Sequence, residues 1–157
     1  MLGPGQYLIK SKGPTDTLLG HHMDSMDMFP VPKPVLSVPE SEGPPEIWRL
    51  EPVISPDAPP GTVFRIFAQQ NYTGIENGEV VIWGIPGQRP QMWTLMPQPG
   101  VEDVFSVVAT DTMEAWTLDP ENRESQGSPT SKISVRPWME AIGGDRTQLF
   151  EFIRTEY

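Results

Sequence analysis

The chain of 157 residues has no cysteine, only two histidines and few basic residues. Without cysteine, the protein has neither a disulfide framework nor a thiol nucleophile. Eleven Lys and Arg against 21 Asp and Glu give a formal net charge of −10. Binding to a nucleic-acid backbone or to an anionic membrane surface is disfavoured, because both usually require a basic face. We expect no nucleic-acid partner and no membrane partner.

Long hydrophobic runs are also absent from the sequence. No apolar run approaches the roughly 20 residues that span a bilayer. The first residues, MLGPGQYLIKSKG, lack the basic and apolar regions of a signal peptide. We therefore expect a soluble, cytoplasmic protein. In that compartment the NYT sequon at Asn71 carries no glycan, because glycosylation needs the secretory route.

Proline and glycine, in contrast, are abundant. Nineteen Pro and 14 Gly predict many turns and little helix, because proline is excluded from helix interiors and central strands. Five Trp and six Phe are enough to fill an interior, although hydrophobic residues make up only 37% of the chain. A chain of this length predicts one domain with a single core.

A strand pattern occurs three times along the chain. Each copy begins with an aromatic strand and ends with another, and a further β-rich run lies between them. The opening segments are GQYLIKS (5–11), TVFRIFA (62–68) and DVFSVVA (103–109), and the closing segments are EIWRLEP (46–52), QMWTLMP (91–97) and QLFEFIR (148–154). The middle runs are KPVLSVP (33–39), GEVVIWGIP (78–86) and SKISVRP (131–137). Most alternate with a period of two, which is typical of strands with one buried face.

Threefold repetition of about four strands predicts an all-β protein with the β-trefoil fold. In that fold a closed six-stranded barrel is covered by three hairpins. The three modules are expected at about 1–52, 53–97 and 98–157, all within a single domain. A sandwich of seven or eight strands is the competing architecture, but it does not explain the triplication.

Several segments resemble a known family. LGPGQYLI, VLSVPE, IWRLEP, QMWTLMP, ISVRP and the closing LFEFI are similar to the mushroom β-trefoil protease inhibitors of the cospin type. The mycocypins, which are mushroom inhibitors of cysteine proteases, are a more distant likeness. QMW also resembles the Q-x-W motif of ricin-type lectins, although EIW and QLF replace it in the other two copies. The resemblance implies a protein that inhibits proteases, in defence against feeders or in regulation, without a cofactor and without enzymatic activity.

In the cospin-type family the loop between the second and third strands enters the protease cleft. By strand order this loop begins here near Leu19 and ends at Lys33. Prolines 30, 32 and 34 favour an extended backbone, and a pre-ordered segment loses less entropy on binding. The residues assigned to protease binding are Leu19, Gly20, His21, His22, Met23, Asp24, Ser25, Met26 and Met28.

This loop departs from a trypsin-directed pattern, because no Arg or Lys lies in its exposed part before Lys33. The S1 pocket of trypsin binds a cation through a buried aspartate. Leucine and methionine side chains suit an apolar S1 pocket instead, so chymotrypsin-like or subtilisin-like serine proteases are the expected targets. The alternatives are that the methionines cover apolar surface at a barrel mouth, or that the loop has lost its activity.

Two further loops provide alternatives. In mycocypins, the loop between the fifth and sixth strands presents an asparagine to legumain, and Gln70, Asn71 and Tyr72 lie at the corresponding place. Carbohydrate binding needs an Asp or Asn beside an aromatic platform. Asn77 with Trp83, and Asp111 with Trp116, are the candidate pairs for glycans.

The adjacent His21 and His22 suggest a metal site, with Asp24 and Asp27 nearby. Neighbouring side chains on an extended segment point in opposite directions, so both imidazoles cannot easily face one ion. No third cluster of ligands is evident, and we expect no metal. Catalysis is disfavoured too, because no Gly-rich phosphate loop is present and a catalytic triad would have to use these two histidines.

Overall fold

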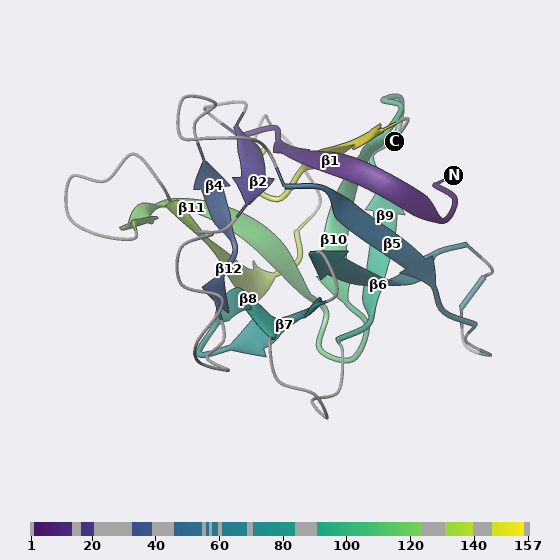
Figure 1. Cartoon of the computed structure of the whole chain (residues 1–157), viewed down its shortest axis with the longest axis horizontal. Coiled ribbons are helices and arrows are strands. Elements are labelled where there is room, and N and C mark those ends of the chain that lie inside the picture. The colour runs from purple at the N-terminus through teal and green to yellow at the C-terminus, as the bar shows by residue number, and fades with distance from the viewer. Residues whose placement is uncertain are drawn as a thin grey trace.

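The computed structural model describes residues 2–13, 17–20, 33–38, 46–54, 56, 58–59, 61–68, 71–83, 91–123, 131–139 and 146–155. In these residues the chain forms thirteen strands and no helix (Figure 1). Accordingly, the described part of the chain contains no helix that could cross a membrane. The all-β class expected from the sequence is confirmed.

Six of the strands form a closed barrel. They are β1 (Gly5–Ser11), β5 (Trp48–Pro52), β6 (Val63–Ala68), β9 (Trp93–Pro97), β10 (Val104–Ala109) and β13 (Phe150–Arg154). Antiparallel pairing runs from β1 to β5, β6, β9, β10 and β13, and β13 pairs with β1 again. A ring of this kind leaves no open sheet edge.

Three hairpins cover one end of the barrel. The first combines β2 (Leu18–Gly20) with β3 (Lys33–Pro34) and β4 (Leu36–Val38). The second pairs β7 (Asn71–Glu76) with β8 (Glu79–Trp83), and the third pairs β11 (Glu114–Arg123) with β12 (Ser131–Pro137). The hairpins also pair with one another, through β3 with β8, β4 with β12 and β8 with β12. This arrangement is the predicted β-trefoil.

The register of the barrel repeats in all three modules. Each opening aromatic residue lies opposite its own closing aromatic residue, in the pairs Tyr7 with Trp48, Phe64 with Trp93 and Phe105 with Phe150. On its other side each closing residue lies opposite a small one, in the pairs Trp48 with Ala68, Trp93 with Ala109 and Phe150 with Ser11. A large side chain beside a small one fills the interior without overlap.

Trp116 of β11 occupies the centre of this core and is fully buried. Its ring meets the three closing aromatic rings edge to face, at centroid distances of 6.4 Å from Trp48, 5.5 Å from Trp93 and 5.9 Å from Phe150. Edge-to-face contacts of this kind add to the stabilisation that burial provides. Trp116 therefore connects the third hairpin to all three modules of the barrel.

Candidate functional site

The first hairpin holds both ends of the segment assigned to protease binding. Residues 18–20 of β2 pair with residues 36–38 of β4, and the hydroxyl groups of Thr17 and Ser37 are hydrogen-bonded beside them. At the other end, Lys33 pairs with Ile82 of the second hairpin. Residues 21–32 lie outside the described residues, and with them the predicted site residues His21, His22, Met23, Asp24, Ser25, Met26 and Met28.

The structure corrects the predicted loop at two residues, Leu19 and Gly20, which lie in strand β2. Leu19 is 1% exposed and belongs to the hydrophobic core. Its carbonyl oxygen accepts a hydrogen bond from the indole N–H of Trp48 at 3.2 Å. Gly20 is also buried, and its backbone pairs with Leu36. Both residues belong to the scaffold, so neither is available to enter a protease pocket.

Asn71 lies in a strand and not in a loop. It is the first residue of β7 and pairs with Ala68 of β6, while Gln70 lies outside the described residues. Tyr72 follows in the same strand, with its ring centroid 4.9 Å from that of Phe67. The guanidinium of Arg49 lies 4.1 Å from the Phe67 ring centroid. Tyr72 is thus packed on the side of the barrel, and Asn71 is half-buried beside the short connection to β6.

The structure does not bring Asn77 and Trp83 together. Asn77 and Gly78 form the tip of the second hairpin, with φ angles of 53° and 75°. These positive values are those of the two-residue turn that favours Asn-Gly, so the asparagine has a conformational role. Trp83 pairs with Tyr72 at the opposite end of the ladder, four residues and about 13 Å along the strand from Glu79. A sugar cannot contact both as the predicted platform requires.

Asp111 and Trp116 do not form a sugar site either. Asp111 is exposed in the turn before β11, and its Oδ1 accepts a hydrogen bond from Nε2 of Gln91 at 2.9 Å. Trp116 is 0% exposed, because it fills the centre of the core. The glutamine of the QMW segment therefore joins the second module to the third, and the tryptophan expected to form a platform is inaccessible.

No metal site is found in the described part of the chain, where no three His, Cys, Asp or Glu side chains gather. The two histidines that suggested one lie outside it.

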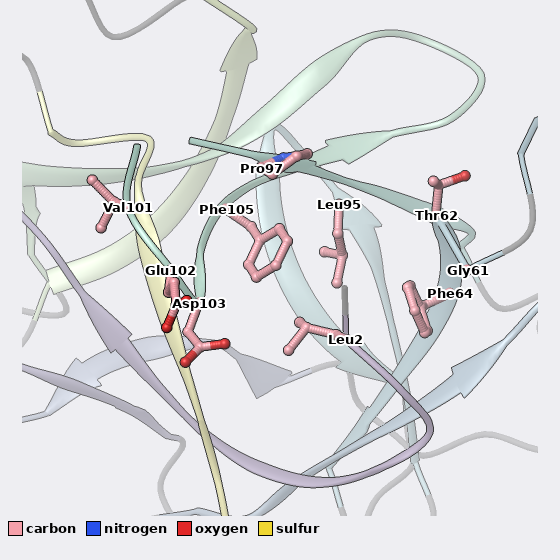
Figure 2. Close-up of a pocket in the computed structure, with 10 residues that line it drawn as sticks. All are labelled: Leu2, Gly61, Thr62, Phe64, Leu95, Pro97, Val101, Glu102, Asp103 and Phe105. Atoms are coloured by element: carbon pink, nitrogen blue, oxygen red, sulfur yellow. The ribbon is translucent and has the colours of Figure 1, made fainter. Parts of the chain in front are cut away.

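Sequence analysis did not predict the cavity at the other end of the barrel (Figure 2). Its volume is about 490 Å³. It is lined by Leu2, Gly61, Thr62, Phe64, Leu95, Pro97, Val101, Glu102, Asp103 and Phe105. The lining residues come from four separate segments, so no local pattern marks them. The adjacent acidic residues Glu102 and Asp103 stand just before an aromatic strand, but by themselves they do not indicate a cavity.

The closed barrel and its three hairpins define the class of protein as a β-trefoil. The chain belongs to the family Peptidase inhibitor I66, which matches residues 1–154. It is therefore a protease inhibitor and not an enzyme, and its partners are proteases. Comparison with curated protein sequences finds no match.

Solved structures show the same fold at low sequence identity. A proteinase inhibitor from Coprinopsis cinerea is 20% identical with a TM-score of 0.79, over 99% of this chain and 100% of that one. ThreeFoil, a designed protein with threefold symmetry, is 17% identical with a TM-score of 0.67, over 96% and 99% of the two chains. A lectin from Polyporus squamosus is 19% identical with a TM-score of 0.62, over 98% of this chain and 50% of the lectin. These likenesses concern the fold alone.

Proposed function

We propose that this protein inhibits serine proteases with an apolar S1 pocket, of the chymotrypsin or subtilisin type, and does not inhibit trypsin. The segment between β2 and β3 would occupy the protease cleft as a substrate does. No cofactor is required, because the inhibitor only has to bind. A protease–inhibitor contact buries about 1,600 Å² in total, so one segment with flanking support is sufficient.

The observation that carries this proposal is the position of the nearest basic residues. No Lys or Arg lies between Lys12 and Lys33. Lys12 lies 3.8 Å from Glu151, at the barrel. Lys33 lies in β3, where its backbone pairs with Ile82, and Pro34 follows it. A cation for the S1 aspartate of trypsin is therefore missing between these two lysines, and the backbone of Lys33 itself is held by its pairing in β3.

Methionines 23, 26 and 28 remain as the side chains that suit an apolar pocket. Complete burial of one such side chain contributes roughly 1.5–3 kcal/mol to binding. Both ends of the segment are held by paired strands, at Gly20 and at Lys33, which lowers the entropic cost of presenting it.

The connection between β6 and β7 supports a second candidate target, legumain. Asn71 is only half-buried and stands directly after the residues that join the two strands. An asparaginyl endopeptidase would require this side chain in its S1 pocket. The backbone pairing of Asn71 with Ala68 opposes such insertion, so we place this candidate second.

Titration of chymotrypsin, subtilisin, trypsin, papain and legumain with the protein tests both proposals. We expect inhibition of chymotrypsin or subtilisin at micromolar inhibitor or below, and no inhibition of trypsin. Inhibition of trypsin alone would contradict the assignment of an apolar pocket. If none of the five enzymes is inhibited at micromolar concentration, the assignment of this chain's target class is wrong.

A further inference from the structure

The cavity lies at the end of the barrel opposite the hairpins. It is lined from the beginning of β6 and β10 and from the end of β9, at Phe64, Phe105 and Pro97. The hairpins join the barrel at the other ends of β1, β6 and β10, where Lys10 pairs with Leu18, Phe67 with Tyr72 and Val108 with Ala115. A ligand in this cavity would thus be remote from the hairpin end of the barrel, where β2 pairs with β1.

The floor of the cavity is apolar and partly aromatic. Leu2, Phe64, Leu95 and Phe105 form it, and each is at most 8% exposed. In Figure 2 the side chains of Leu2, Leu95 and Phe105 point toward the middle of the cavity. A volume of about 490 Å³ lies within the range of sites that hold small organic molecules, roughly 300–1,000 Å³.

One side of the rim carries two carboxylates, those of Glu102 and Asp103, which lie next to each other in Figure 2. Among the described residues that line the cavity, none is basic. No ion pair between described residues includes either rim carboxylate. Two neighbouring negative charges without a counter-ion attract a cation and repel an anion.

The turn that carries these carboxylates is held in place by its backbone. Gln98 N–H donates to the carbonyl of Val104 at 2.9 Å, and Phe152 N–H donates to the carbonyl of Asp103 at 2.8 Å. Asp103 has a φ of 62°, which turns the chain from the rim into β10. Because the backbone is fixed on both sides, the turn that bears the two exposed carboxylates is in place before any ligand arrives.

We propose that this cavity binds a small organic cation with an aromatic body. The ammonium group lies against Glu102 and Asp103, and the ring packs on Phe64, Leu95 and Phe105. This site is independent of the proposed protease specificity, because a different end of the barrel forms it.

Isothermal titration calorimetry with tryptamine tests the proposal, and indole-3-propionate serves as the probe with the same ring and the opposite charge. We expect saturable binding of tryptamine and none of indole-3-propionate. The variant with Glu102→Gln and Asp103→Asn should bind tryptamine at least roughly tenfold more weakly, because both charge-assisted contacts are lost. Asn tolerates the positive φ at position 103, so this variant should retain its fold.

A matched control removes two charges elsewhere, with Glu76→Gln and Glu114→Gln, neither of which lines the cavity. This control should bind tryptamine as the natural chain does. The proposal fails if tryptamine does not bind at millimolar concentration, if both probes bind alike, or if the two double variants weaken binding equally. It also fails if sedimentation shows a dimer that Val101→Trp disrupts, because a second copy would then occupy the cavity.

Discussion

The indole nitrogen of Trp93 lies 2.9 Å from the hydroxyl oxygen of Thr73, in the buried interior. The Thr73 hydroxyl donates in turn to the carbonyl of Ile66 at 2.8 Å. One side chain of the second hairpin therefore connects two barrel strands, β9 and β6. Trp48, in the equivalent place of the first module, donates instead to the backbone carbonyl of Leu19 at 3.2 Å.

Replacement of Thr73 by valine keeps the shape of the side chain and removes its hydroxyl. The Trp93 N–H and the Ile66 carbonyl would each lose this partner in the core. We expect the free energy of unfolding to fall by about 1–3 kcal/mol in urea denaturation. Thr94→Val is the control, because its hydroxyl contacts Thr110 at an exposed position and should matter less. Equal loss in both variants would show that the buried connection contributes nothing specific.

Gly74 should not tolerate a side chain, because a Cβ there would lie 1.9 Å from Nε1 of Trp83. Gly74→Ala must displace the indole ring that lies across the second hairpin, and we expect a loss of about 1–3 kcal/mol in stability. Trp83→Ala in the same chain removes the obstacle. The double variant should therefore lose less stability than the sum of the two single variants. Additive losses would contradict this contact.

Leu19→Ala should reduce stability and not protease affinity. The side chain is 1% exposed, so its truncation leaves a cavity and costs about 2–5 kcal/mol in the free energy of unfolding. Ile54, which is 99% exposed, provides the control, since Ile54→Ala should change stability by less than about 0.5 kcal/mol. Unfolding should be followed by tryptophan fluorescence. A fully stable Leu19→Ala variant with weakened inhibition would return Leu19 to the protease-binding residues.

Replacement of Met23, Met26 and Met28 together by alanine should abolish inhibition of the serine protease. The three changes remove the apolar side chains available for the S1 pocket, each worth roughly 1.5–3 kcal/mol when buried. The measurement is the inhibition constant against whichever enzyme the titration identifies, with urea denaturation to show that the variant is folded.

Asn71→Ala is the control for the triple methionine variant, because Asn71 lies in β7 and outside the segment between β2 and β3. It should leave inhibition of the serine protease unchanged and remove only inhibition of legumain. Unchanged serine-protease inhibition in the triple variant would show that a different loop enters the cleft.

On a glycan array, the protein should bind no sugar through the residue pairs first considered, which are Asn77 with Trp83 and Asp111 with Trp116. Trp116 is inaccessible, and Asn77 and Trp83 stand at opposite ends of their hairpin. Should a glycan bind and Asp111→Ala remove that binding, the third module would contain a sugar site that does not use Trp116.

Much of the scaffold was predictable because its residues interact in a repeated local pattern. Period-two alternation marks Tyr7, Phe64 and Phe105 as strand residues, and in the structure they lie opposite the predicted closing residues. Leu19 was misplaced because its strand has only three residues, of which two adjacent ones are buried, so no alternation along the sequence marks it. Trp116 was wrongly assigned to a sugar platform, because the residues around an aromatic side chain near a turn do not show whether it faces solvent or the core.

The sequence by itself determined the all-β class, the threefold repeat and the missing basic residue before Lys33, because these depend on residue type and spacing along the chain. Only the tertiary structure decided that Trp116 stands between Trp48, Trp93 and Phe150, and that Leu19 belongs to the core. It also decided that Leu2, Phe64, Leu95 and Glu102 surround one cavity. These relationships join residues far apart in sequence, and they arise when the barrel closes and each side chain acquires its neighbours.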